Sequence, residues 1–431
     1  MLKPINKNDS QTLAKYVSER IQEISADILL TATDIIEQVR TQGDDALLAL
    51  TKKFDRTELA SLQVSEQELD QAIARCDPAF MDAMRQAKKN IEFCHKAQKQ
   101  NSFLLQKEMN IYLGQRVIPL DSVGIYVPGG RAQYPSSVLM NAIPAHVAGV
   151  RRIVMVTPPG PDGTIHPNIA FAARLAGVDE IYKVGGAQAI AALAYGTQTI
   201  KPVDKIVGPG NIYVAAAKKL VFGKVDIDMI AGPSEILVIA DEGADPEFVA
   251  ADLLSQAEHD PMACSILIAL SGEKVEAVNK ALRRQSTVLP KREIVEQSLA
   301  SHGHSIVADS IEEAIDISNQ IAPEHLELMI KDPMSYLGLV RHAGSVFLGY
   351  YTCESIGDYF GGTNHVLPTS GTARFSSALG VDSFIKKSSY LHYSREALDA
   401  YGAMIVKMAQ EERLDAHANA AKVRMEAYDS E

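Results

Sequence analysis

The sequence predicts an α/β fold made of two units, each a parallel sheet covered by helices. Short apolar strands alternate with helical segments from residue 122 to residue 348, separated by short Gly- or Pro-containing links. This alternation is typical of parallel sheets buried on both faces. A second round of alternation begins just after 231–233 (AGP), so we place the boundary between the two units there.

The elements follow from the spacing of apolar residues. In the first unit we expect strands at 123–127, 152–157, 180–184 and 205–207, with helices at 135–149, 168–177, 188–195 and 211–222. In the second unit we expect strands at 235–240, 264–270, 305–308 and 345–348, with helices at 245–258, 273–285 and 311–320. Amphipathic patterns predict that residues 1–121 are mainly helical, and that the tail 381–431 holds two further helices, one of them at 395–410.

Composition excludes several classes of protein. The chain has 431 residues, a net charge of −12 and 22% charged residues. An acidic chain lacks the basic face that nucleic acids or anionic membranes require, and no apolar run approaches the length of a membrane span. The first residues lack the apolar core of a signal peptide, which points to the cytoplasm. The four cysteines are scattered and are expected to be small buried hydrophobes.

Three glycine-containing turns follow expected strands of the first unit. They are VPGGRA (127–132), VGGAQA (184–189) and VGPGN (207–211). At the carboxyl ends of parallel strands, backbone N–H groups and helix starts bind anionic ligands. No G-x-G-x-x-G motif is present, so the turns indicate a nucleotide or phosphate-bearing ligand only as a set.

The helix expected at 245–258 ends in the stretch LLSQAEHD. Asp252, Gln256 and His259 fall at i, i+4 and i+7, which places them along one helical face. Gln256 and His259 could therefore bind one ion, although a solvated helix end explains the same pattern.

Three later segments concentrate acids and histidines. Glu324 and His325 are adjacent after a proline and suit acid–base chemistry, because histidine titrates near neutral pH and burial can raise the pKa of a glutamate. The segment 357–369 is expected to be an ordered loop, and it carries Asp358, Asn364 and His365. The tail carries Glu412 and His417.

Gln256, His259, Asp358 and His417 together supply two imidazoles, a carboxylate and an amide. This nitrogen and oxygen set suits Zn²⁺ or another first-row divalent ion. Spacing alone does not bring the four together, because they span about 160 residues. Ser234, at the junction of the two units, is well placed to contact a ligand.

A run of motifs resembles the histidinol dehydrogenase family from about residue 120 to residue 421. The motifs, in family order, are VGIYVPGG, VGGAQAIAALAYGT, KIVGPGN, AGPSEILVIAD, DLLSQAEHD, PEHLEL, AGSVFLG, GDYFGGTNHVLPT and RLDAHANA. The resemblance implies two incomplete Rossmann-like parallel-sheet domains with a helical N-terminal segment and an extended helical C-terminal tail. The implied boundaries are 1–121 for the N-terminal segment, 122–233 for the NAD-binding domain, 234–380 for the domain with the zinc and acid–base residues, and 381–431 for the tail.

The resemblance also implies an activity and its residues. The family oxidises L-histidinol through the aldehyde to L-histidine, the last step of histidine biosynthesis, with NAD and one Zn²⁺ per subunit of a homodimer. The implied zinc ligands are Gln256, His259, Asp358 and, from the partner's tail, His417. The implied substrate contacts are the zinc ligands together with Ser234, His325, His365 and Glu412. The implied NAD contacts are Tyr126, Gln188 and Asn211.

Glu324 and His325 are the expected acid–base pair. His325 would accept protons in both oxidations, and Glu324 would activate the water that adds to the aldehyde. Two rival readings stay open: a paralogue that oxidises another small amino or hydroxy alcohol, and a non-catalytic metal-bound scaffold. The Glu324–His325 pair argues against the second, because a pure binder needs no acid–base set.

Overall fold

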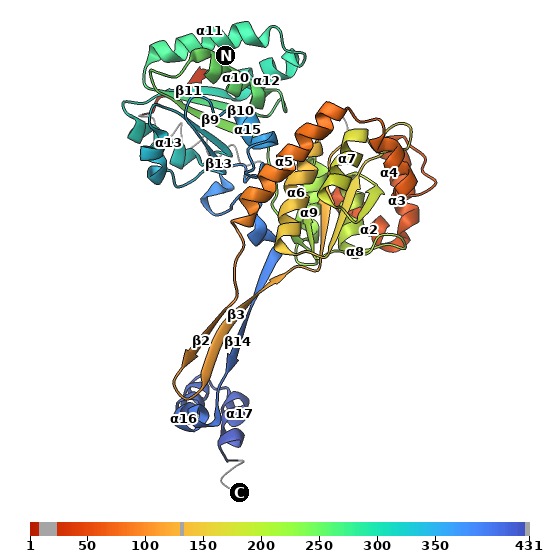
Figure 1. The fold of residues 1–431 in the computed structure, drawn as a ribbon, viewed down its shortest axis with the longest axis vertical. Helices are drawn as coiled ribbons and strands as arrows, with labels where there is room; N and C mark the ends of the chain where they lie inside the picture. The colour runs from red at the N-terminus through yellow and green to blue at the C-terminus, as the bar shows by residue number, and fades with distance from the viewer. Residues whose placement is uncertain (8–23, 130–132, 427–431) are drawn as a thin grey trace. The chain divides into compact units, whose positions relative to one another are not determined.

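The computed structural model describes residues 1–7, 24–129 and 133–426, which divide into two units (Figure 1). The first unit comprises Met1–Gln98 and Leu120–Phe384, and the second comprises Lys99–Pro119 and Ile385–Glu431. The two parallel sheets, called sheet A and sheet B below, both belong to the first unit. The α/β prediction with two parallel sheets is confirmed.

Sheet B has five parallel strands in the order β6-β5-β4-β7-β8. Its strands are β4 (Ser122–Tyr126), β5 (Arg152–Thr157), β6 (Glu180–Lys183), β7 (Lys205–Val207) and β8 (Asp226–Ile227). The helices between them are α6 (Pro135–Ala148), α7 (Pro167–Ala176), α8 (Gly186–Tyr195) and α9 (Ile212–Val221). Four N-terminal helices pack on this sheet and its helices: α2 (Ala26–Gln42), α3 (Asp44–Asp55), α4 (Glu66–Ile73) and α5 (Pro78–Lys96).

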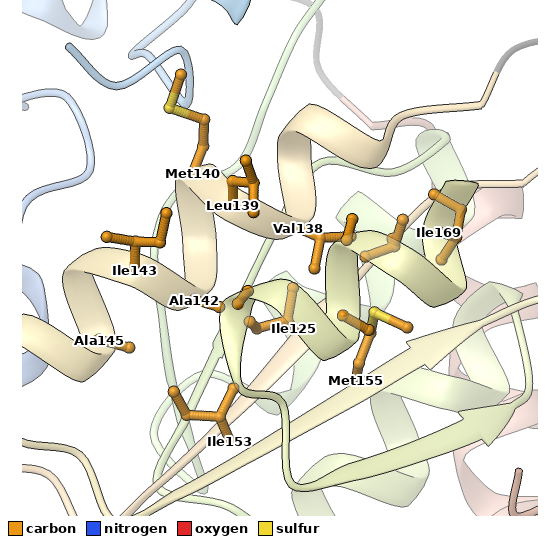
Figure 2. Close-up of a cluster of buried hydrophobic side chains, with 14 of the residues drawn as sticks. Ile125, Val138, Leu139, Met140, Ala142, Ile143, Ala145, Ile153, Met155 and Ile169 are labelled. Carbon is orange, nitrogen blue, oxygen red and sulfur yellow. The ribbon is translucent and has the colours of Figure 1, made fainter. Parts of the chain in front are cut away.

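Strand alternation gives sheet B two separate cores. Figure 2 shows one of them, in which α6 side chains such as Val138 lie with Ile125 of β4 and Met155 of β5. Val154 and Val156 point to the opposite face and pack with residues of α2, α3, α8 and α9. A strand covered on both faces carries apolar residues continuously, which is why these strands were recognisable in the sequence.

Sheet A has six parallel strands in the order β1-β11-β10-β9-β12-β13. Its strands are β1 (Lys3–Pro4), β9 (Glu235–Ala240), β10 (Cys264–Ala269), β11 (Gly303–Val307), β12 (His325–Met329) and β13 (Ser345–Leu348). Its main helices are α10 (Pro246–Ala257), α11 (Gly272–Ser286), α12 (Arg292–His302), α13 (Ile311–Ile321) and α15 (Glu354–Tyr359).

The second unit contains strands that the sequence reading missed. Strands β2 (Phe103–Lys107), β3 (Ile111–Pro119) and β14 (Ile385–His392) form an antiparallel sheet in the order β14-β3-β2. Residues 1–121 and 381–431 therefore hold strands in addition to the predicted helices. All residues of β2 and nearly all of β14 are exposed, so the buried apolar face that identifies a strand is absent there. Helices α16 (Arg395–Glu411) and α17 (Asp415–Glu426) match the helices predicted in the tail.

None of the helices in the described residues is long and apolar enough to cross a membrane.

Candidate active site

The candidate site lies where β12 begins. Ala322 ends α13 with a left-handed backbone (φ 54°), and it is followed by Pro323, which cannot continue a helix. His325, the first residue of β12, and Glu324 before it are both buried. After the reversal at Ala322 the two adjacent residues lie in one buried polar cluster.

His325 has a defined tautomer in its neutral form. Its Nδ1 lies 3.0 Å from the backbone carbonyl of Glu235, which can only accept, so Nδ1 carries the proton. Its Nε2 is buried and has no hydrogen-bond partner among the described residues. The nearest carboxylate oxygens to Nε2 belong to Asp358, at 3.6 Å, and Glu354, at 3.9 Å. Nε2 is therefore the nitrogen that can exchange a proton with a bound molecule.

Glu324 lies beside the same ring. Its Oε2 accepts from the backbone N–H of Glu235 at 2.8 Å and is 3.6 Å from Nδ1 of His325. Burial raises the pKa of Glu324 to about 8, against the opposing effect of His325. Burial alone would lower the pKa of His325, but the surrounding carboxylates of Glu324, Glu354 and Asp358 raise it well above its usual value.

Asp358 lies on α15, so the prediction that it sits on a loop is wrong. The segment was taken as a loop because α15 is only six residues long and too short for a helical period. Glu354 and Asp358 are four residues apart and therefore share one face of α15. His365 follows the helix: its Nδ1 lies 2.8 Å from the carbonyl oxygen of Asp358, and its Nε2 lies 3.2 Å from Oγ of Ser137 on α6.

The last turn of α10 supplies Gln256 and, just beyond it, His259. Gln256 is buried, whereas His259 follows the end of the helix at Ala257. The expected i, i+4, i+7 face thus stops at Gln256, and a turn carries His259 to the cluster. His259, Glu354 and Asp358 each offer one ligand atom, and these atoms all lie within 4.8 Å of one another.

A set of acids, four of them buried and Asp358 half-buried, lies in this cluster. It comprises Asp252, Glu324, Glu327, Glu354 and Asp358, and no Lys or Arg among the described residues forms an ion pair with any of them. Burial raises the pKa of Asp252 to about 6 and that of Glu354 to about 7. The pKa of Glu327 is raised well above its usual value by burial and by its neighbour Asp252. A bound cation would stabilise so many neighbouring carboxylates. The oxygen donors of the acids and the nitrogen donor of His259 suit a divalent metal ion.

A pocket of about 310 Å³ opens beside His259. Its lining includes Phe80 and Met84 of α5, Tyr134 before α6, and Tyr359 of α15. A small molecule can therefore approach the cluster along a wall that is mainly apolar, with His259 as a polar group in that wall.

The predicted NAD contacts lie at the carboxyl ends of the strands of sheet B. Tyr126 ends β4, is buried, and its hydroxyl accepts from the backbone N–H of Gly186 at 3.1 Å. Gln188 is buried in the first turn of α8, whereas Asn211 is exposed and caps α9. In the VGPGN turn a Cβ on Gly208 would sit 2.2 Å from the carbonyl oxygen of Tyr126, so only glycine fits there. Residues 130–132 of the VPGGRA turn lie outside the described residues.

Comparison with known proteins identifies the family. The histidinol dehydrogenase family model matches residues 18–425. The chain belongs to the histidinol dehydrogenase family. Histidinol dehydrogenase of Clostridium acetobutylicum is 55% identical over 416 residues, which are 96% of each chain. That of Geobacillus kaustophilus is 56% identical over 393 residues, covering 91% of this chain and 93% of the relative. The crystal structure of histidinol dehydrogenase from Elizabethkingia anophelis matches with a TM-score of 0.94 and 41% identity, over 99% of each chain.

In this member of the histidinol dehydrogenase family, the first unit brings together six of the residues picked from the sequence: Gln256, His259, Glu324, His325, Asp358 and His365. Ser234 directly precedes β9, whose first residue binds Glu324. Glu412 and His417 belong to the second unit and are exposed.

Sequence reasoning missed Asp252 as a site residue, and it missed Glu327 and Glu354 altogether. Glu327 lies two residues beyond His325 on one strand, and Glu354 lies one helical turn before Asp358. Each therefore shares a face with a residue that was already singled out, and this spacing was the signal that could have found them.

Proposed function

We propose that this protein oxidises L-histidinol through L-histidinaldehyde to L-histidine, in two successive NAD-dependent steps that complete histidine biosynthesis. The substrate follows from the family and from the names of the relatives. The observation that carries the chemistry is the buried Nε2 of His325, which has no hydrogen-bond partner among the described residues, on a ring whose Nδ1 lies 3.6 Å from Oε2 of Glu324. A base with one nitrogen fixed by a carbonyl and the other free suits repeated proton transfer.

We assign the metal site to Gln256, His259 and Asp358 of one subunit and to His417 of its partner. The buried acids and the clustering of ligand atoms from His259 and Asp358 support a divalent cation, for which Zn²⁺ is the family's ion. When bound, the ion holds the imidazole and amino nitrogens of the substrate. A cation among these carboxylates also offsets the field that raises the pKa of His325, and so favours the neutral ring that a base requires.

His325 and Glu324 divide the proton transfers. In the first oxidation Nε2 of His325 accepts the hydroxyl proton while the carbon-bound hydrogen leaves as hydride. Before the second, Glu324 accepts a proton from the water that adds to the aldehyde, while His325 returns its proton to the aldehyde oxygen to complete the hydrate. His325 then accepts a proton from the hydrate as the second hydride leaves. NAD takes up one hydride in each oxidation, so two NADH form for each histidinol.

The cofactor and the second subunit complete the proposal. We assign Tyr126, Gln188 and Asn211 to the NAD site, because each ends or follows a strand at the carboxyl edge of sheet B, where α/β sheets bind nucleotides. Ser234, His365 and, across a homodimer, Glu412 would contact the substrate. The exposed apolar residues Met404, Ile405 and Met408 on α16 support a subunit contact by the tail. We place the enzyme in the cytoplasm.

The proposal is tested by the stoichiometry of NADH formation with zinc-loaded protein and a limiting amount of L-histidinol. We expect two NADH for each histidinol and L-histidine as the product. One NADH per substrate would reject the second oxidation, and turnover of another amino alcohol in preference to histidinol would favour the paralogue. Light scattering of the same sample tests the homodimer.

A further inference from the structure

Glu354 is held rigidly at the start of α15. It is buried, and its backbone N–H donates to Oε1 of Glu327 at 3.0 Å. Its side-chain Oε2 accepts from the hydroxyl of Ser255 on α10 at 2.9 Å. The backbone of Glu354 is thus held by β12 through Glu327, and its carboxylate is held by α10 through Ser255.

The amide of Gln256 lies between two groups that each allow only one kind of hydrogen bond. On one side is the Glu354 carboxylate, whose oxygens accept; on the other is the backbone N–H of Glu235, which donates. When Glu354 is ionised, its carboxylate can pair with this amide only if the amide nitrogen donates to it. The amide oxygen then accepts at 2.9 Å from the Glu235 N–H, which it shares with Oε2 of Glu324. The reverse orientation would set acceptor against acceptor and donor against donor.

We propose that Glu354 is a positioning residue that orients the Gln256 amide for metal binding. The inference rests on the proposed function, because it assumes that Gln256 is a ligand. Only the amide oxygen has a lone pair available for a metal ion, and its two lone pairs allow a second partner besides Glu235. By occupying the amide nitrogen, Glu354 keeps the nitrogen out of the ligand position. Groups that orient metal ligands in this way contribute strongly to metal affinity.

A competing role is that Glu354 itself binds the ion, since one of its oxygens lies within 4.8 Å of ligand atoms of His259 and Asp358. The two roles differ in their dependence on Gln256. If Glu354 only positions Gln256, its substitution does not change the affinity for the metal ion once the Gln256 amide is removed. If Glu354 is a ligand, its substitution lowers that affinity whether or not the amide is present.

The test is a double-mutant cycle on Zn²⁺ affinity, measured by competition with a chromophoric chelator on the full-length protein. In Glu354→Gln the new side chain can donate as well as accept, so both amide orientations of Gln256 become available. We expect the affinity for Zn²⁺ to fall by about 10- to 100-fold. In the Gln256→Ala background the same change should have less than about a twofold effect, because nothing remains to be oriented. Equal losses in both backgrounds would overturn the proposal, as would unchanged affinity in Glu354→Gln.

Further measurements separate the outcomes. The visible absorption bands of the Co²⁺-substituted protein should keep their positions in Glu354→Gln, and a shift in the bands would indicate that Glu354 is a ligand. Glu293→Gln, an exposed change on α12, is the matched control and should leave the affinity unchanged. If Glu354→Gln does not fold, Glu354→Asp keeps the charge, shortens the reach to Gln256 and should also weaken binding. Wild-type protein that binds no Zn²⁺ would instead refute the metal site of the proposed function.

Discussion

The two parallel sheets of the first unit place their chemically interesting residues at opposite ends of their strands. In sheet B, Tyr126 is the last residue of β4, and Asn211 follows β7. In sheet A, Glu235 and His325 are the first residues of β9 and β12. The proposed NAD site of sheet B thus follows the rule that ligands bind at the carboxyl ends of parallel strands, and the proposed metal and acid–base site of sheet A does not.

The path of α10 explains the difference. This helix begins beyond the carboxyl end of β9 and returns along the sheet, so its last turn, with Gln256, lies at the amino end of the strands. Helix C-termini offer carbonyl groups and favour cations, whereas the helix starts that follow the strands of sheet B favour anions. We therefore expect changes in sheet A to alter kcat or metal binding, and changes in sheet B to alter the KM for NAD.

The largest effect is expected for His325→Ala. Without Nε2 no group is placed to accept the proton in either oxidation, so kcat should fall by about 10⁴-fold with histidinol and with histidinaldehyde alike. The KM for NAD should change little. Steady-state kinetics with each substrate would measure both constants. A variant with a raised KM for NAD and an unchanged kcat would contradict the proposed division between the sheets.

Glu324→Gln should separate the two oxidations. The amide cannot accept a proton from water, so aldehyde oxidation should fall by about 10²-fold and alcohol oxidation by less than about tenfold. Stopped-flow measurement of NADH formation from histidinol and from histidinaldehyde gives the two values. Equal losses would remove Glu324 from the water-activating role and leave it a residue that orients its neighbours.

The contrast between the sheets also shows what the sequence could reveal. Most strands of both sheets were predictable because burial on both faces gives continuous apolar runs, as at β5 and β10. The short strands β1 and β8 were not predicted, nor was β12, whose run is interrupted by His325 and Glu327. His259 and Asp358 were recognised as a pair only through the family resemblance, since about 100 residues separate them and no local period links them. Strand β2 was missed because all of its residues are exposed, so nothing in it alternates between core and solvent. Exposed strands and long-range clusters depend on tertiary contacts that no local pattern encodes.

A smaller effect is expected from Asn211→Ala in sheet B. The change removes one exposed polar group at the predicted NAD edge, so the KM for NAD should rise by up to about tenfold while kcat stays near the wild-type value. The same change removes a helix cap, because Oδ1 of Asn211 accepts from the N–H groups of Tyr213 and Val214. Ser310→Ala is the matched control: it removes the cap of α13, on sheet A, and should leave the KM for NAD unchanged. A similar rise in both variants would show that loss of a cap, and not of a cofactor contact, is responsible.

The smallest effect concerns an acid near sheet B whose pKa is raised by burial, as it is for Asp252 of the sheet A cluster. Asp55 ends α3, and burial raises its pKa to about 6 from 3.8. Its Oδ2 has no hydrogen-bond partner among the described residues. Because the folded-state pKa is the higher one, the folded protein favours the protonated acid, so the stability advantage present below pH 4 is lost as the pH rises through 6.

Asp55→Asn should remove this dependence of stability on pH. Relative to wild type, the variant should gain about 1 kcal/mol of unfolding free energy between pH 4 and pH 7, a value reduced for the partial exposure of the group. Urea unfolding at both pH values measures the change, with the exposed Asp34→Asn on α2 as control. A difference that does not vary with pH would mean that Asp55 stays charged in the folded protein. In that case a partner for its carboxylate, and not a raised pKa, would explain its position beside Tyr126.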